Sequence, residues 1–585
     1  MILQALYNYY ETLAARGEIS RPGWTVARIS HALEISATGE LLSVFPLKTL
    51  QGDGKKLVAR EMNLPAPVKR TAGVAANFLW DNAMYMLGFD LKGNPERAKQ
   101  CFTEAKKLHL ELLGEVADPF AKAICSYFEN WNPDSMMENP IITDLSTEME
   151  AGDNFVFIFE RQFASENTAL GTAWQQYYDN EKSGEMLRCL VTGNSIVPEA
   201  THPAIKNVRD AKSSGAALVT FNSSAFCSYG REQNLNAPVG KYAAFAYTTA
   251  LNRLLSNRKN VVYIGDTTVV FWAESAEEEY QNAFTLMLNN DDSAMTDKNL
   301  RSILDKLSRG MQADWDSVPL EPNNRFYVLG LSPNSSRISV RFFLCDSFGN
   351  FARHSQAHYA GLEIVKPEFE ALANLPLWML MRETMNPNST DKKSSPQMSG
   401  DTLRSILTGA RYPTTLFQSV EMRIRADRKI NYRRAAIIKS YLLRNSTNEA
   451  IKEVLTVQLN EDTTYQPYVL GRTFAILESI QKSANPAINT TIKDKYLSSA
   501  CATPAKIFPI LFNLSQKHLR KMEKGKSIYF SKQLGGITSR LTESLPVHHT
   551  LEDQGIFQIG YYHQQQKQYE KKNSEAETKE GNENG

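Results

Sequence analysis

The stretch RFYVLGLSPNSSRISVRFFLCDSF, from Arg325 to Phe348, has the pattern that best defines the fold. Two runs of alternating apolar residues are joined by Ser-Pro-Asn-Ser-Ser, which is typical of a β-hairpin. A similar alternation flanks an Ala-Thr-Gly turn within residues 27–47, and two short strands are expected around Gly265-Asp266. Further buried strands are expected at residues 154–160, 189–193 and 217–222. The sequence therefore predicts antiparallel hairpins in the first part of the chain.

The pattern changes near Phe369, after which helical periodicity dominates and strand signals nearly vanish. We therefore predict an α+β protein with a large mixed N-terminal region and an all-helical C-terminal bundle. The expected domains are residues 1–368, a helical connecting region at 369–455, a helical bundle at 456–563 and a disordered polar tail at 564–585. A helix that starts near Pro509 is expected in the bundle.

Composition excludes several classes of protein. Among 585 residues, 65 Lys and Arg balance 64 Asp and Glu, so the net charge of +1 favours no particular partner. The six cysteines are scattered and form no CxxC pair, which disfavours a zinc site and a disulfide framework. The sequence shows no signal peptide and no apolar run long enough to span a membrane. We expect a cytoplasmic protein with reduced thiols and no cofactor.

Motifs of common enzymes are missing. There is no GxxxxGK[ST] loop for a nucleoside triphosphate and no GxSxG elbow. His354 and His358 are four residues apart, but no third ligand stands beside them, so we interpret them as ordinary surface histidines. Asp266 and Glu274 could be metal ligands of a nuclease, although acidic residues in this context are more often structural.

Residues 55–77 form the first of three stretches that suit nucleic acid. Cationic side chains can neutralise phosphates, a glycine permits close backbone approach, and an amide can bond a base edge. The candidates are Lys55, Lys56, Lys69, Arg70, Thr71, Gly73 and Asn77. The alternative is a surface loop that enters a strand. In both cases we expect Phe78, Trp80 and Tyr85 to lie mostly in the core.

The second stretch is the polar loop that follows the strand expected at residues 217–222. Polar side chains at the end of a buried strand are well placed to contact a ligand. The candidates are Asn222, Ser223, Ser228, Tyr229, Gln233, Asn234 and Asn236. A turn network that satisfies only its own backbone is the alternative.

The third stretch is basic and helical. Arg425, Lys429 and Arg433 recur at four-residue spacing and would form one stripe, and a second cluster follows around residue 520. We interpret both clusters as paths for a nucleic-acid backbone, with a merely solvated face as the alternative. The candidates are Arg425, Arg428, Lys429, Arg433, Arg434, Lys439, Lys517, Arg520, Lys521 and Lys524.

Several long blocks together resemble a known family. They are NFLWDNAMYMLG (77–88), ALVTFNSSAFCSYGREQNLNAPV (217–239), YTTALNRLL (247–255), IGDTTVVFWA (264–273), NYRRAAIIKSYLLRN (431–445) and YVLGRTFAILE (468–478). They are similar, in the expected order, to blocks of the large subunit of the type I-C CRISPR surveillance complex, Cascade. The resemblance extends from Met1 to about Tyr562.

The resemblance implies a non-catalytic subunit that senses a protospacer-adjacent motif in double-stranded DNA and opens the duplex for a guide RNA. It also implies that the C-terminal helices are like the small subunit and line the channel that holds the heteroduplex and the displaced strand. The implied partners are CRISPR RNA, target DNA, the backbone and RNA-processing subunits, small subunits and a recruited helicase-nuclease, with no membrane. Two alternatives remain, namely the metal-dependent nuclease and an architectural scaffold whose basic helices contact only proteins.

Overall fold

The computed structural model describes residues 1–585 except 51–56, 69, 71–72, 91–92, 136–137, 147–148, 151, 180–183, 290–296, 316–317, 371–373, 391–393, 542–543 and 584–585. The chain divides into two compact units. The first unit comprises Met1–Pro203 and Val219–Leu251, and the second comprises Ala204–Leu218 and Asn252–Gly585. The mixed first part and helical last part confirm the predicted α+β class.

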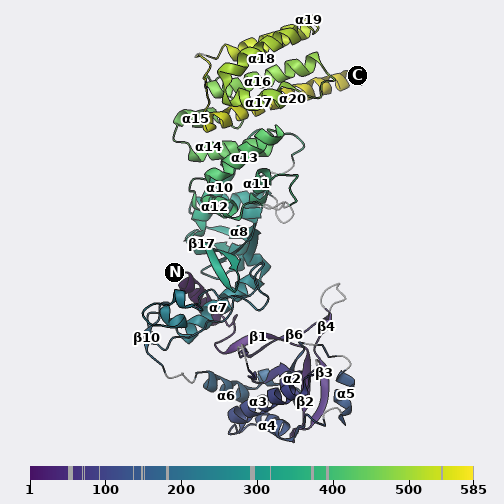
Figure 1. Cartoon of the computed structure of the whole chain (residues 1–585), viewed down its shortest axis with the longest axis vertical. Helices are drawn as coiled ribbons and strands as arrows, with labels where there is room; N and C mark the ends of the chain where they lie inside the picture. Colours follow the sequence, from purple (N-terminus) through teal and green to yellow (C-terminus); the bar gives the residue numbers. More distant parts are fainter. Residues whose placement is uncertain are drawn as a thin grey trace. The chain divides into compact units, whose positions relative to one another are not determined.

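The first unit is built around a sheet with strand order β3-β2-β8-β7, in which β2 and β8 are parallel and β9 pairs with β8. Helices α3 and α4 pack together, and α4 also contacts β2 and β8 (Figure 1). The elements are α1 (Ile2–Ala15), β1 (Trp24–Ile29), β2 (His31–Ile35), β3 (Leu41–Pro46), β4 (Thr49–Leu50), β5 (Leu57–Val58), β6 (Arg60–Pro65), β7 (Trp80–Asn82), α2 (Ala83–Met86), α3 (Pro95–Leu113), α4 (Pro119–Asn130), α5 (Pro140–Ser146), β8 (Asn154–Phe159), β9 (Gln162–Phe163), α6 (Thr168–Asp179), β10 (Leu187–Arg188), β11 (Ser195–Ile196) and α7 (Lys241–Ser256).

The second unit contains an antiparallel sheet of order β12-β13-β16-β17 and the C-terminal helices. Its elements are β12 (Val261–Ile264), β13 (Thr267–Ala273), α8 (Glu278–Asn289), α9 (Asp297–Ser308), β14 (Ala313–Trp315), β15 (Val318–Leu320), β16 (Arg325–Asn334), β17 (Arg337–Ser347), α10 (Phe348–Leu362), α11 (Leu377–Thr384), α12 (Pro396–Thr408), α13 (Thr414–Asp427), α14 (Tyr432–Asn445), α15 (Glu449–Val454), α16 (Gln466–Ala484), α17 (Ile492–Ala502), α18 (Pro504–Leu519), α19 (Lys524–Thr538) and α20 (Leu551–Glu583).

Local sequence signals explain several of these elements. The hairpin predicted at 325–348 is confirmed, and Asn334 pairs with Arg337 across its turn, where Ser335 has a positive φ of 57°. The hairpin within residues 27–47 is also confirmed as β2 and β3. Asn94 caps α3 by accepting a hydrogen bond from the Arg97 N–H at 3.2 Å.

Two predicted strands are wrong. Residues 189–193 form a tight turn in which the Gly193 N–H donates to Cys189 O at 2.9 Å. Residues 217–222 contain only an isolated bridge from Ala217 to Arg337. Both apolar runs are short, and such runs do not by themselves distinguish a strand from buried irregular structure. The helix expected to start near Pro509 instead starts at Pro504 and contains Pro509.

The helices α16 and α20 pack closely at glycine residues. A Cβ atom placed on Gly471 would lie 1.9 Å from Phe557 O, and one placed on Gly560 would lie 2.3 Å from Tyr468 O. Only glycine allows the two backbones to approach this closely. Helix α16 also contacts α17, α18 and α19 (Figure 1), so it lies at the centre of this bundle.

The two compact units differ from the divisions that composition suggests. One apolar core in the second unit includes Phe271 and Phe326 of the sheet together with Phe474 and Phe557 of the helices. The change in sequence pattern near Phe369 therefore marks the end of the strands rather than a break in packing. At the other end of this unit, α20 continues through residues 564–583, where a disordered tail is expected. Within the described residues, no helix combines the length and apolar character that crossing a bilayer requires.

Candidate nucleic-acid interface

Arg70, a predicted phosphate ligand, takes part in an internal network. Its guanidinium forms an ion pair with the buried Asp81 carboxylate, and its Nε–H donates to Ala75 O at 2.6 Å. The same guanidinium lies 4.0 Å from the centroid of the Tyr85 ring. Burial raises the pKa of the Asp81 carboxyl, and Arg70 opposes that shift. Because these contacts use much of the guanidinium, Arg70 holds the loop in place in this structure.

Asn77 is buried, which differs from the groove contact predicted for it. Its Oδ1 accepts the Val68 N–H at 3.0 Å, and its own N–H donates to Asp81 Oδ2 at 2.9 Å. Gly73 is exposed with a φ of +114°, and a Cβ there would meet nothing within 4 Å. The remaining candidates of this stretch, Lys55, Lys56, Lys69 and Thr71, lie outside the described residues.

Three aromatic residues follow this loop in the sequence. Phe78, Trp80 and Tyr85 are buried, as predicted. Between the first two, Leu79 has a strained φ of 68°, and its N–H donates to His109 Nε2 at 2.9 Å. Burial lowers the pKa of His109 to about 4, so the ring is neutral at pH 7 and its Nε2 is free to accept.

The loop of residues 223–236, here called the 223–236 loop, exposes most of its side chains. Tyr229 is fully exposed, at 100%, with a positive φ of 55°, and Phe226 is 45% exposed. Ser223, Ser228 and Gln233 are also exposed, as is Asn222 immediately before the loop.

Asn236 fixes the shape of the 223–236 loop. Its Oδ1 accepts the Ser228 N–H at 2.8 Å, and its Nδ2 donates to Arg231 O at 3.1 Å and to Gln233 O at 2.9 Å. Asn234 is buried, and its Oδ1 has no hydrogen-bond partner among the described residues. Asn236 therefore belongs to the turn network, whereas the Tyr229 ring is exposed to solvent.

The first basic cluster does not form the single helical stripe that we predicted. Helix α13 ends at Asp427 and α14 begins at Tyr432, with Arg428 left-handed between them, so Arg425, Lys429 and Arg433 belong to three different segments. Arg425 and Lys429 are exposed, whereas Arg433 is half-buried and pairs with a carboxylate of Glu370 at 3.3 Å.

Arg434 and Lys439 are buried, which differs from the predicted contact with a nucleic-acid backbone. Arg434 pairs with Asp427 at 2.7 Å and with Glu383 at 3.0 Å. Lys439 Nζ donates to Gly361 O at 3.4 Å, and burial lowers the pKa of this ammonium group. Both residues therefore stabilise packing between helices.

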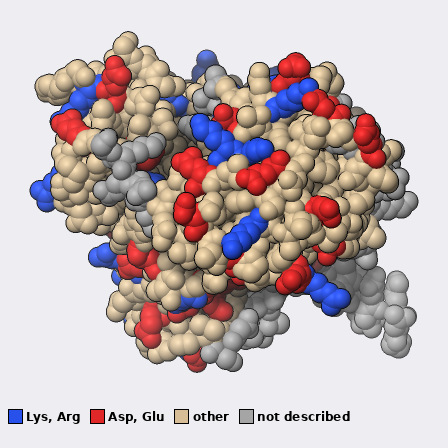
Figure 2. Space-filling model, turned by 90° about the horizontal axis from the view of Figure 1, so that it is seen from below, with Lys and Arg blue, Asp and Glu red and all other residues tan. Residues whose placement is uncertain are grey.

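The second basic cluster is exposed. It surrounds the connection between α18 and α19, here called the α18–α19 corner, and consists of Lys517, Arg520, Lys521 and Lys524. Within the described part of the chain none of these four side chains forms an ion pair, so their charge is available to a partner. On the face drawn in Figure 2, by contrast, Lys and Arg are interspersed with Asp and Glu.

Comparison with known families agrees with the sequence blocks. The family model described as CRISPR-associated protein (Cas_Csd1) matches residues 6–569. The chain belongs to this family. No curated protein matches the chain. Membership supports the resemblance as far as a CRISPR-associated protein.

The nuclease alternative has no support in the geometry of this family member. Asp266 and Glu274 flank β13 at its two ends, which places their Cα atoms roughly 26 Å apart at 3.3 Å per strand residue. The Asp266 carboxylate accepts from Ser332 at 3.4 Å, and Glu274 accepts the Tyr327 hydroxyl at 3.0 Å. One ion cannot bridge both carboxylates, and no group of three potential metal ligands occurs among the residues that are described.

The interpretation of both histidines as surface residues is wrong for His358. Both lie on α10, where His354 is half-buried and its Nδ1 is 2.9 Å from Leu407 O. His358 is buried, its Nδ1 is 2.5 Å from the Tyr412 hydroxyl, and burial lowers its pKa to about 3.

The sequence prediction missed some of the exposed residues near the candidate interface. Lys526 and Lys532 on α19 are exposed beside the α18–α19 corner, and Lys526 pairs with Glu523 at 3.2 Å. Both lysines occur in the basic stretch around residue 520, so their helical spacing could have identified them as candidates. No comparable signal marks Phe226 as exposed, because an isolated phenylalanine is usually buried.

Proposed function

We propose that this chain is the non-catalytic large subunit of a type I-C CRISPR Cascade complex. It senses the protospacer-adjacent motif in duplex DNA, promotes duplex opening and R-loop formation, holds the displaced strand and helps to recruit the helicase-nuclease. It acts in the cytoplasm with CRISPR RNA, the backbone and RNA-processing subunits, and small subunits. Membership of a CRISPR-associated family along nearly the whole chain supports this role.

The observation that carries the proposal is the fully exposed Tyr229 ring on a loop that Asn236 holds in shape. An aromatic ring at a fixed position can stack on an unpaired base or enter an opened base step. Duplex opening costs unstacking energy, which contacts of this kind offset. The exposed Arg231 on the same loop supplies charge for an adjacent phosphate.

The α18–α19 corner supports the second part of the proposal. Four exposed cations without ion pairs among the described residues suit a backbone path that reads no sequence. The guide RNA reads the target sequence by base pairing. The protein therefore needs to recognise only the shape of the nucleic acid, its phosphates and a few bases.

The test uses the assembled, guide-loaded complex and a target duplex. We expect Tyr229→Ala to weaken target binding by about tenfold, because one stacked base contributes on the order of 1–3 kcal/mol. This loss should persist at high salt, since stacking is not ionic. Tyr177→Ala, which removes another exposed tyrosine, is the matched control. Equal binding and unwinding by both variants would contradict the role of the 223–236 loop.

A second measurement addresses the α18–α19 corner and the scaffold alternative. Replacing Lys517 and Lys521 by Gln should reduce the slope of log K against log salt by about 1.4 to 1.8 if each contacts one phosphate. An unchanged slope, together with crosslinks from the corner to protein alone, would favour the scaffold.

A further inference from the structure

Residues 205–216, here called the 205–216 loop, form a basic loop of the second unit that the proposed function does not use. The Ile205 and Ala216 backbones pair in an antiparallel bridge, and both of its N–H···O bonds measure 2.9 Å. Beside this bridge, a Cβ placed on Gly215 would lie 2.9 Å from Ile205 O, so only glycine permits this close approach. Backbone contacts therefore close the base of the loop.

Two neighbouring elements, α7 and β13, hold the loop in place. The Lys206 N–H donates to Asn252 Oδ1 at 2.7 Å, and Asn252 Nδ2 donates to Ala204 O at 3.0 Å. The Arg209 N–H donates to the hydroxyl of the buried Thr268 at 3.1 Å. These bonds use the backbone N–H groups of the two cationic residues and leave their side chains free to bind a partner. The loop therefore keeps one shape before any ligand binds.

The cationic side chains of this loop face solvent. Lys206, Arg209 and Lys212 are exposed, and none of them forms an ion pair with another described residue. Asp210 is the acidic residue of the loop, so three cations against one carboxylate leave a net charge of +2. Lys206 Cγ lies 3.3 Å from the position of a Cβ on Gly215, whose N–H donates to Lys212 O at 2.9 Å. The two lysines thus belong to neighbouring segments of one small surface.

Arg209 lies over an aromatic ring. Its guanidinium carbon is 5.4 Å from the centroid of the Tyr263 ring on β12, which is 52% exposed. A guanidinium that stacks on a ring still presents N–H donors at its edge, and two of them can bind one phosphate. Because the ring restricts the arginine side chain, less conformational freedom is lost when a ligand binds.

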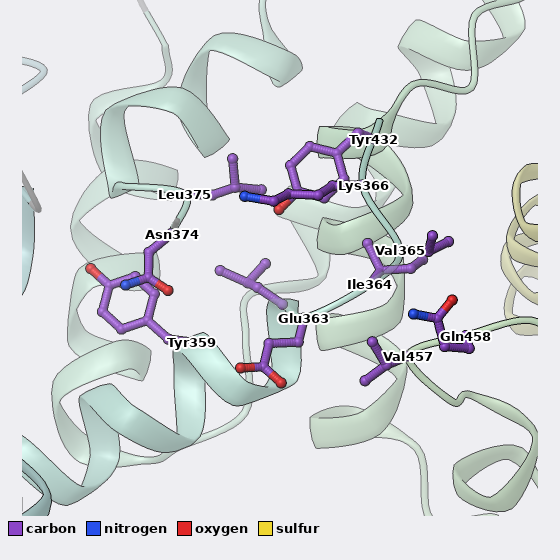
Figure 3. Close-up of a pocket in the computed structure, with 11 residues that line it drawn as sticks. Tyr359, Glu363, Ile364, Val365, Lys366, Asn374, Leu375, Tyr432, Val457 and Gln458 are labelled. Carbon is purple, nitrogen blue, oxygen red and sulfur yellow. The ribbon is translucent and has the colours of Figure 1, made fainter. Parts of the chain in front are cut away.

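These features suit a phosphate backbone better than unpaired bases. The 205–216 loop contains no aromatic residue that could stack on a base. Its cations can neutralise phosphates and release the counterions of a duplex. The cavity of about 340 Å³ at the end of α10 offers no such surface (Figure 3), because apolar side chains such as Ile364 and Leu375 line it and Lys366 already interacts within the chain.

We propose that the 205–216 loop binds the phosphate backbone of double-stranded DNA. Lys206, Arg209 and Lys212 each contact one phosphate, and Arg209 does so through two donors of its guanidinium edge. Phosphate contacts of this kind position a protein on the duplex and carry no sequence information. The choice of DNA rests on the proposed function, whereas the affinity for a phosphate backbone rests on the loop alone.

The test titrates the full chain against a labelled DNA duplex of about two helical turns and measures fluorescence anisotropy at several salt concentrations. Combining Lys206→Gln, Arg209→Gln and Lys212→Gln should reduce the slope of log K against log salt by about 2.7, which is about 0.9 for each phosphate. The backbone N–H groups that hold the loop remain in this variant, so it should fold. The control removes three other exposed cations of the same unit and should leave the slope nearly unchanged: Lys306→Gln, Arg404→Gln and Lys495→Gln.

Four outcomes would overturn the proposal. The first is an equal change of slope in the loop variant and in the control, and the second is no binding of the duplex by the wild type at low salt. The third is tighter binding of an RNA duplex of the same length. The fourth is displacement of the DNA by polyglutamate as effectively as by unlabelled duplex, which would indicate an acidic protein partner. The measurement needs no guide RNA and no matching target, so failure of the loop and failure of the DNA-sensing role remain distinguishable.

Discussion

Glu421 on α13 is a buried carboxyl group that should make the stability of the second unit depend on pH. Its Oε2 accepts a hydrogen bond from Gln558 Nε2 of α20 at 2.8 Å. The Oε1 atoms of Glu421 and of Gln558 are both buried and have no partner among the described residues. A proton on Glu421 gives this pair of side chains one O–H donor, which an ionised carboxylate lacks.

The pKa of Glu421 gives the size of the effect. Burial, only partly opposed by Gln558 and Arg425, raises this pKa from 4.5 to about 7. Below pH 4.5 Glu421 is protonated in both the folded and the unfolded states, so it does not lower the free energy of unfolding. Between pH 4.5 and 7 the unfolded state releases its proton first, and stability falls as pH rises. Above pH 7 the full cost is about 3 kcal/mol, at 1.36 kcal/mol for each pKa unit.

The assay compares urea unfolding of the wild type with that of Glu421→Gln at pH 5, 6, 7 and 8. Glutamine keeps the shape, accepts from Gln558 and carries no charge. We expect the stability of the variant relative to the wild type to rise with pH, by about 2.5 kcal/mol between pH 5 and 8, because part of the cost is already present at pH 5. Cys501, which lies near Glu421, and Asp553, which lies near Cys501, are present in both proteins. The exposed Glu453→Gln is the control, and a difference that stays constant over this pH range would refute the reasoning.

Two further predictions concern packing in the second unit. Gly560→Ala should destabilise by about 3 kcal/mol or more, because its Cβ would lie 2.3 Å from Tyr468 O and overpacking costs about 1–3 kcal/mol in ordinary cores. Gly536→Ala on α19, where nothing lies within 4 Å, should instead stabilise by about 1 kcal/mol, and thermal unfolding of both variants checks the pair. Arg434→Met should cost about 3 kcal/mol, because it leaves the half-buried Glu383 without its ion pair and leaves Asp427 with only Arg423, at 3.4 Å. Arg404→Met at an exposed site should change stability by less than about 0.5 kcal/mol, and equal losses in urea unfolding would contradict this assignment.

The elements that were predicted correctly from the sequence are specified by residues that lie close together in the chain. The turn of the 325–348 hairpin and the Asn94 cap of α3 depend on residues within a few positions of one another. The strands wrongly predicted at 189–193 and 217–222 had only short apolar runs, whose conformation depends on distant partners. Gly471 and Gly560 show the same limit, because their role appears only when α16 and α20 are placed together.

The candidate interface was harder to predict because sequence does not reveal which polar groups become buried. Arg70 and Asn77 suit phosphate and base contacts by residue type, but Asp81 draws both into an internal network. Tyr229 was a candidate from its position in a polar loop, and only the structure shows its complete exposure.

Exposure and pairing therefore divide the cations of this chain into two physical classes. Buried Arg434 and Lys439 lose their hydration and recover interaction energy only from fixed partners, so their charge sets the packing of α14 and cannot also neutralise a phosphate. Lys517 and Lys521 are exposed and keep their hydration, so under the proposed function they would release counterions from a bound phosphate backbone and make the affinity depend on salt. The first basic run is therefore divided, because Arg425 and Lys429 are exposed while Arg434 and Lys439 are buried. Of the two clusters, the α18–α19 corner is the one whose four cations are all exposed and form no ion pair among the described residues, and for this reason the proposed function assigns it to a backbone whose sequence varies from one target to the next.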